Sequence, residues 1–231
     1  MNTCNKKRTE FYYGIGKEIV KEGIFERFPD LIPAVGECYW REDGQHKKML
    51  LVGESNYFDD KDILDSDFRD AEMWYKAEDA KLIPEAKKVL VNNWKGQYPT
   101  FDRVYEVMDE VLTAANIEHN AYLLQETAFY NYFLRPAYND GIHKGFVPQD
   151  IDREVSGVAL SGIIDRLNPD LVIFLSKNAY DEFLKYICRN SLQYGESLIQ
   201  FVYHPGNHFS WYNANGKAKF ERLLKEYWIS K

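Results

Sequence analysis

Three clusters of polar side chains in this sequence have the residue types that acid–base chemistry and hydrogen-bonded recognition need. The first covers residues 53–58, the second surrounds Asn131, and the third covers residues 204–210. The first supplies a carboxylate, Glu54, and the third an imidazole, His204, two groups that can move protons or stabilise charge. The amide of Asn131 has a donor side and an acceptor side, so it can match the edge of a pyrimidine.

The clusters lie at or near the ends of short apolar runs. Four such runs have the length and the β-branched or aromatic content of buried strands. They predict strands at residues 48–52, 128–133, 171–175 and 198–203.

Segments with helical periodicity lie between the predicted strands. Apolar side chains recur at steps of three to four in residues 101–115, in residues 150–167 and after Asn215. Strands that alternate with amphipathic helices form a mainly parallel sheet covered on both faces. We therefore predict an α/β fold, a three-layer α/β/α sandwich with a mainly parallel, four-stranded central sheet. Such sheets bind ligands beyond the carboxyl ends of their strands, where the three clusters would converge.

The chain has 231 residues, 45% of them hydrophobic, and no internal repeat or Pro/Gly/Ser linker divides it. We expect a single domain over residues 1–231. Residues 1–45 are expected to be an N-terminal extension packed on this domain, with a helix near residues 17–27. Residues 59–80 are expected to be an acidic insertion, because the stretch 54–80 holds ten acidic and three basic residues.

Charge restricts the partners that the chain can have. The net charge of −7 argues against a protein that coats nucleic acid through a broad basic face. Residues 171–231 nevertheless hold eight basic and five acidic residues, so a polyanion would approach this part of the chain. No stretch is long and apolar enough to span a membrane, and residues 1–11 lack the apolar core of a signal peptide. We expect a cytoplasmic protein with no membrane partner.

The three cysteines, Cys4, Cys38 and Cys188, are widely spaced and include no CxxC pair. They are expected to be reduced thiols rather than ligands of zinc or of an iron–sulfur cluster. We therefore predict no cofactor and no bound metal. The protein is also expected to be a monomer.

In kind and order, the clusters resemble the motifs of the uracil-DNA glycosylase superfamily. The family's first strand ends in a Gly-led loop, GQDPYH in one branch and GEAPG in another, where this chain has GESNYF at residues 53–58. An Asn at a later strand end reads the uracil edge, as Asn131 would, and the last strand ends in a His-Pro-Ser loop, here His204-Pro205-Gly206. Residues 168–175 look like the family's third strand, and residues 176–179 would open the next helix.

The resemblance spans roughly residues 48–228 and implies a DNA glycosylase-like protein. Such a protein binds a flipped or single-stranded base and hydrolyses its N-glycosidic bond. Glu54 would activate or orient the attacking water, and His204 would donate to the base carbonyl as its oxygen becomes anionic. Tyr57 would crowd the 5-position of the base, and Phe58 would stack on it. The substrate-binding residues are then Gly53, Ser55, Asn56, Tyr57, Phe58, Asn131 and Phe209, the last as an apolar wedge in the DNA stack.

Several departures set this chain apart from the known branches. Ser55 stands where the GQDPYH branch has its catalytic Asp, and Asn56 replaces Pro. Gly206 takes the Ser position of the His-Pro-Ser loop, which removes a hydroxyl that can contact a phosphate. The cluster-binding cysteines of the GEAPG branch are absent. The chain therefore resembles a divergent branch, whose substrate need not be uracil in DNA.

Two further interpretations use the same residues. A module that binds a nucleotide or single-stranded nucleic acid without cutting it would have the same pocket. Alternatively, Glu54, Asn131 and His204 are structural residues that cap turns or bond to the backbone, and Phe209 belongs to the core.

Two rival chemistries are less favoured by the sequence. The order Ser55 before His204 also occurs in α/β-hydrolases, but the second glycine of GxSxG is missing. His204 and His208 are four residues apart, as metal ligands on a helix can be. Pro205 and Gly206 lie between them, however, so a shared helix is not expected.

Overall fold

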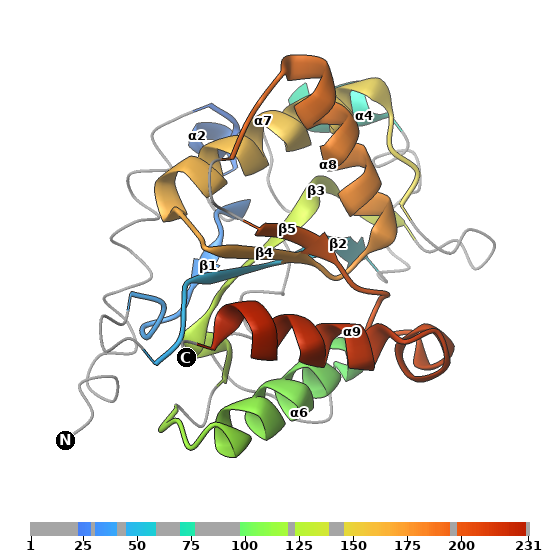
Figure 1. Ribbon diagram of the computed structural model, residues 1–231. Helices are drawn as coiled ribbons and strands as arrows, with labels where there is room; N and C mark the ends of the chain where they lie inside the picture. The colour runs from blue at the N-terminus through green and yellow to red at the C-terminus, as the bar shows by residue number, and fades with distance from the viewer. Residues whose placement is uncertain are drawn as a thin grey trace.

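The computed structural model describes residues 23–28, 31–40, 45–58, 70–76, 98–119, 123–138, 146–194 and 198–229. These residues form an α/β fold in which helices flank one five-stranded sheet (Figure 1). The strands are β1 (Ala34–Val35), β2 (Met49–Phe58), β3 (Ala128–Tyr138), β4 (Leu171–Phe174) and β5 (Leu198–Phe201).

The sheet has the strand order β1-β3-β2-β4-β5. β2 pairs in parallel with both β3 and β4, and β4 pairs in parallel with β5. The prediction of a mainly parallel sheet is confirmed, but the predicted number of four strands was wrong. The fifth strand is β1, which runs antiparallel to β3. It has two residues, too few for a periodic pattern to reveal it in the sequence.

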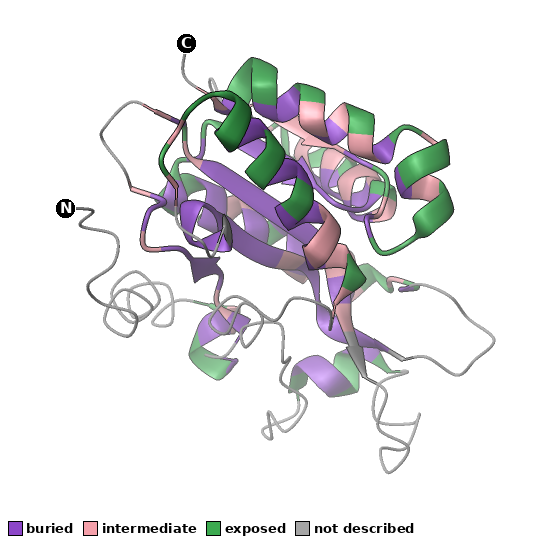
Figure 2. Cartoon of the chain, turned by 90° about the horizontal axis from the view of Figure 1, so that it is seen from below, coloured by how far each residue is buried: buried purple, intermediate pink, exposed green. Residues whose placement is uncertain are grey.

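Helices lie on both faces of the sheet (Figure 1). On one face, α6 (Pro99–Ala114) and α9 (Gly216–Leu223) pack on side chains such as Met49 and Leu51. On the other face, α7 (Asp150–Leu167) and α8 (Lys177–Asn190) pack on side chains such as Leu50 and Val52. Figure 2 shows the strands buried between these helices. The helices predicted at residues 101–115, at residues 150–167 and after Asn215 are confirmed.

Short helical segments complete the described elements. The 3₁₀ turn η3 (Leu123–Glu126) leads into β3, and the π-helical turns η4 (Phe209–Asn213) and η5 (Leu224–Trp228) flank α9. On the α7 and α8 side lie α2 (Ile24–Arg27) and α4 (Ala71–Lys76) (Figure 1). The helix expected near residues 17–27 corresponds in part to α2, since residues 17–22 lie outside the described residues.

The acidic segment contributes to the core. Within residues 59–80 the structure describes residues 70–76, which contain α4. The Trp74 and Tyr75 side chains of α4 are buried, and the Trp74 ring stacks on Phe28 with 4.9 Å between centroids. This part of the acidic segment therefore packs against the N-terminal region through its aromatic side chains.

One cysteine expectation was wrong. Cys38 is disulfide-bonded, whereas Cys188 is free and exposed. Cys4 lies outside the described residues. Spacing in the sequence did not reveal the bond, because the fold decides which cysteines approach one another. In the part of the chain that the structure describes, no helix is long and apolar enough to cross a membrane.

The connections between strands identify the edge of the sheet where a ligand would bind. From β2 the chain passes through α6 to β3, and from β3 it passes through α7 to β4 on the other side of β2. Parallel α/β sheets bind ligands outside the carboxyl ends of the strands, at such a reversal of strand order. The carboxyl-terminal half of β2, which carries Glu54, lies at this reversal.

Candidate functional site

Residues 53–58 lie within β2 and not in a loop after it, because β2 runs on to Phe58. The expectation of a loop was wrong: β2 continues to pair with β3 as far as Phe58, beyond the apolar run that predicted it. Side chains alternate between the faces of a strand, so Glu54 lies on the same side as Val52, toward α8. The longer strand fixes the backbone of this cluster against β3.

The Glu54 carboxylate is held by three donors. Its Oε1 accepts hydrogen bonds from the backbone N–H of Phe146 at 3.2 Å and from Nδ2 of Asn178 at 3.4 Å. Its Oε2 accepts a hydrogen bond from the Ser176 hydroxyl. Ser176 is the N-cap of α8, and its Oγ also accepts a hydrogen bond from the backbone N–H of Ala179. The carboxylate therefore lies at the N-terminal end of α8, where the helix dipole favours a negative charge.

A buried ion pair positions the segment that contains Phe146. Nε and Nη2 of Arg135 bond to Oδ1 and Oδ2 of Asp152 at 2.9 and 2.6 Å. Nη2 of Arg135 also donates to the carbonyl of Val147 at 3.3 Å, and its guanidinium lies 4.7 Å from the centroid of the Phe146 ring. The Phe146 ring stacks on Phe133 of β3. The N–H group that Glu54 binds is thus fixed by a charged pair and a ring stack.

Asn131 lies in β3, directly opposite Gly53 in the parallel pairing with β2. Its Nδ2 donates to Oδ1 of Asn56 at 2.6 Å. Asn131 is partly exposed and does not point into the core, which is what base recognition requires. The structure thus brings together Gly53, Asn56 and Asn131 at the carboxyl end of β2.

An irregularity in the sheet accompanies the Asn56 contact. Between Ser55 and Tyr57 the register of β2 against β3 shifts, since Ser55 pairs with Phe133 but Tyr57 pairs with Ala137. The extra residues of β3 include Pro136, which lacks an N–H group and is tolerated in strands at such bulges. Bulges re-aim side chains, and here the Asn56 amide meets the neighbouring strand.

His204 begins a tight turn after β5. The backbone N–H of Asn207 bonds to the carbonyl of His204 at 3.1 Å, and Pro205 occupies the second position, where its fixed φ suits a turn. Nδ1 of His204 accepts a hydrogen bond from the backbone N–H of Gly206 at 3.0 Å. When the ring is neutral, its proton therefore lies on Nε2, which makes Nε2 a hydrogen-bond donor.

Close packing explains why residue 206 is glycine. A β-carbon there would lie 2.7 Å from Cε1 of His204 and 2.7 Å from Oγ1 of Thr100. Such contacts require the neighbouring atoms to move. Glycine at this position therefore allows the imidazole to lie against the turn.

Arg103 of α6 holds the same turn from the other side, donating through Nη1 to the carbonyl of Pro205. Burial lowers the pKa of His204 below its ordinary value of 6.5, the negative charge of Glu54 opposes this shift, and the positive charge of Arg103 adds to it. The imidazole is therefore neutral at pH 7. The negative charge of Glu54 in β2 thus acts on the His204 ring in the turn after β5.

The other predicted site residues differ in exposure. Phe209 is 68% exposed, so the alternative that it belongs to the core was wrong, whereas Trp211 in the same turn is fully buried. Tyr57 and Phe58 end β2, and the structure describes their backbone only. Ser55 is buried.

The structure disfavours both rival chemistries. Ser55 lies within a strand and not at a strand-to-helix elbow, and its hydroxyl has no hydrogen-bond partner among the described residues. His208 is exposed, and its ring packs on Tyr212 with 4.7 Å between centroids. In the described ranges, no group of three or more His, Cys, Asp or Glu side chains could hold a metal ion.

Several residues of the site were not predicted. Ser176 and Asn178 were noted only as the start of a helix, although their polar side chains follow a strand, a signal that could have placed them at the site. Arg103 and Thr100 gave no such signal, because their role depends on how α6 packs against the turn at His204.

In comparisons with known proteins, no protein-family model matches the chain, and no curated protein matches it.

Proposed function

We propose that this chain is a divergent member of the uracil-DNA glycosylase superfamily that binds a flipped or single-stranded base and hydrolyses its N-glycosidic bond. One observation carries the proposal: a carboxylate, Glu54, and a histidine, His204, lie close enough for the Glu54 charge to act on the His204 pKa, at the edge of the sheet that also carries the Asn56–Asn131 amide pair. These are the groups that base cleavage needs, at the place where α/β sheets bind ligands.

When the glycosidic bond breaks, positive charge develops on the sugar and negative charge on the departing base, and a different protein group acts at each. A water oxygen attacks C1′ of the sugar and passes one proton to Glu54, while the bond between C1′ and the base nitrogen breaks. The base leaves with the bonding electron pair, and the charge spreads to its carbonyl oxygen. Nε2–H of His204 donates to that oxygen, and the base later takes up a proton. The products are a free base and an abasic sugar.

The amide pair would recognise the base. The hydrogen bond from Asn131 to Asn56 fixes the rotation of the Asn131 amide. Its second N–H then remains for the acceptor side of a base, and the Asn56 amide nitrogen has no partner among the described residues. Recognition through amide edges is selective, because a base with the wrong pattern leaves buried polar groups unpaired.

A second candidate is a module that holds a base or nucleotide without cutting it. The observation that favours it is the environment of Glu54, both of whose oxygens already accept hydrogen bonds from the protein. These hydrogen bonds leave less of the carboxylate available to an attacking water. Single-stranded nucleic acid bound without base release would support this candidate.

The test is base release from oligonucleotides that contain uracil, hypoxanthine or xanthine, in single and double strands, followed by alkali to cut abasic sites. We expect release from at least one substrate and a rate about 10²–10⁴-fold lower for Glu54→Gln. Asn131→Ala should also reduce release. The matched controls are Glu72→Gln, an exposed carboxylate of α4, and Asn190→Ala, an exposed amide of α8.

Two results would contradict the proposal in different ways. Absence of release from every substrate at a large excess of protein would exclude the enzyme. If base is released and neither Glu54→Gln nor Asn131→Ala changes the rate, the chain is a glycosylase but these residue assignments are excluded.

A further inference from the structure

An aromatic cluster lies at the free edge of the sheet. β5 is the last strand in the sheet order, and its four side chains are only partly buried. The ring centroid of Phe201 lies 5.0 Å from that of Tyr180 on α8 and 5.8 Å from that of Tyr203. Tyr203 is 39% exposed and directly precedes His204. The cluster therefore adjoins the candidate site.

Two lysines approach the Phe201 ring from different helices. Nζ of Lys177, the first residue of α8, lies 5.8 Å from the ring centroid, and Nζ of Lys219 of α9 lies 3.8 Å from it. α8 and α9 cover opposite faces of the sheet (Figure 1). The two lysines consequently both reach the β5 edge. No further strand among the described residues lies there between the two helix layers.

The charge at this edge is not balanced. Lys177 pairs with Asp181, but Lys219 and Arg222 form no ion pair with any described residue. Burial, and then the positive charge of Arg222, lower the pKa of Lys219. Lys219, which forms no ion pair with any described residue, lies against the partly exposed Phe201 ring with Lys177 nearby, and this arrangement is complementary to an anion that carries flat groups.

We propose that this edge, formed by Lys177, Tyr180, Phe201, Tyr203 and Lys219 and here called the edge platform, binds single-stranded nucleic acid next to the base in the site. The lysines would contact phosphates and the rings would stack on bases. The inference rests on the proposed function, because it concerns the strand that flanks the bound base.

Two features favour a single strand over other occupants. Bases in a duplex are stacked on each other and do not offer their faces to rings such as Tyr203, whereas single-stranded bases do. A peptide strand added to β5 would have to pair along the edge that Lys219 crosses, and lysines at sheet edges oppose such pairing. Positive charge combined with exposed rings therefore matches a single-stranded polyanion best.

The test is binding of a fluorescent oligodeoxythymidylate of about a dozen nucleotides, measured by anisotropy over a range of salt concentrations. We expect Tyr203→Ala and Lys219→Ala each to weaken binding about tenfold, and Lys219→Ala to lower the salt dependence by about one phosphate contact. Tyr203→Phe and Lys219→Arg should restore most of the affinity, which distinguishes a lost contact from a damaged fold.

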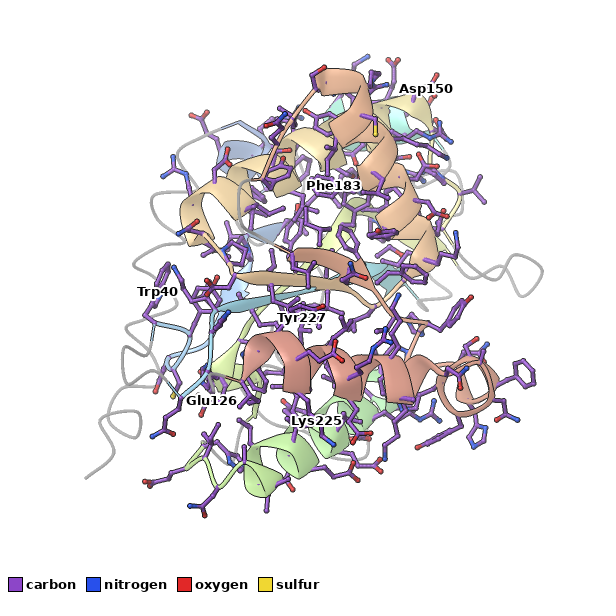
Figure 3. All side chains as sticks on the ribbon, in the orientation of Figure 1. Trp40, Glu126, Asp150, Phe183, Lys225 and Tyr227 are labelled. Atoms are coloured by element: carbon purple, nitrogen blue, oxygen red, sulfur yellow. The ribbon has the colours of Figure 1, made fainter. Side chains whose placement is uncertain are left out.

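The chain offers matched controls on the same C-terminal helical region. Lys225 pairs with the neighbouring Glu221, and Tyr227 is 42% exposed, close to the exposure of Tyr203 (Figure 3). Both lie in η5, whose Trp228 bonds to Lys47 just before the start of β2. They are therefore at the opposite end of the parallel strands from His204. Lys225→Ala and Tyr227→Ala should change the affinity by less than about twofold.

The outcomes separate the edge platform from the proposed function. If the protein binds the oligonucleotide and neither Tyr203→Ala nor Lys219→Ala weakens this binding, the edge platform is excluded. A preference for duplex over single-stranded DNA would also exclude it. Base release is measured separately on a trinucleotide. If no base is released but binding still depends on the edge platform, the glycosylase proposal is excluded and the edge platform is supported.

Discussion

The side-chain oxygen of Asn131 fills the space that a side chain at Gly53 would occupy. A β-carbon on Gly53 would lie 2.1 Å from Asn131 Oδ1 and 3.0 Å from Cζ of Phe129. The two residues pair directly between β2 and β3, so the absence of a side chain on one strand determines where the amide of the other lies.

Gly53→Ala should therefore displace the Asn131 amide and break its bond to Asn56. Overpacking of this kind costs about 1–3 kcal/mol of stability, and base recognition should be lost with it. Urea unfolding and base release measure the two effects. Gly162→Ala is the control, since Gly162 lies in α7 with open space around it and should be neutral or stabilised by about 0.5–1 kcal/mol.

Gly206→Ser should disrupt the site. The new β-carbon would collide with the His204 ring and with Thr100, so the imidazole must rotate away from the turn. We expect slower base release and a changed chemical shift for the His204 ring protons in NMR spectra. Unchanged ring shifts together with full activity would show that the turn accommodates a side chain.

The titration of His204 should make stability depend on pH. Its pKa is lowered in the folded protein, mainly by burial, so the unfolded chain binds more protons between the folded value and 6.5. Stability should then rise with pH across this window, and the contribution is lost as the pH falls through it. NMR titration of the ring gives the pKa, and urea unfolding of wild type and His204→Gln gives the difference. A His204 pKa above 6.5 would contradict the expectation.

Asp152→Asn should destabilise the fold more than a surface substitution does. It removes the charge of Asp152 from a buried ion pair with Arg135, and breaking a buried pair in this way costs about 3–5 kcal/mol. Because this pair positions the segment next to Glu54, activity should fall as well. The double variant Arg135→Met with Asp152→Leu should recover stability but not the geometry of that segment. Asp150→Asn, which removes an exposed ion pair with Arg153, should change stability by less than about 1 kcal/mol.

Much of the fold followed from local patterns. The apolar runs at β2, β3, β4 and β5 and the periodic segments at α6, α7 and α9 were each visible in a short window of sequence. β1 was not, because two residues show no period. The extension of β2 to Phe58 was not visible either. Its polar residues belong to the strand because they pair with β3, which is distant in the sequence.

The site was predictable only in part. Glu54, Asn131 and His204 could be selected because polar residues at strand ends meet at one edge of a parallel sheet. The partners of these residues come from elsewhere: the N-cap Ser176, the helical Arg103, and Phe146 in a connecting segment. Their contacts depend on how helices pack and how connections turn, and no spacing between residues encodes that.

The central position of β2 also has a consequence for how the molecule is made. β2 pairs with β3 on one side and with β4 on the other, and Leu50 is aligned with Val172 of β4, far along the chain. Contacts between residues so distant in sequence form slowly, because a long stretch of chain must be ordered before they contribute. A growing chain on the ribosome that has passed Glu54 but not yet His204 therefore lacks the imidazole of the candidate site. The candidate site can therefore form only after the chain has been made as far as His204.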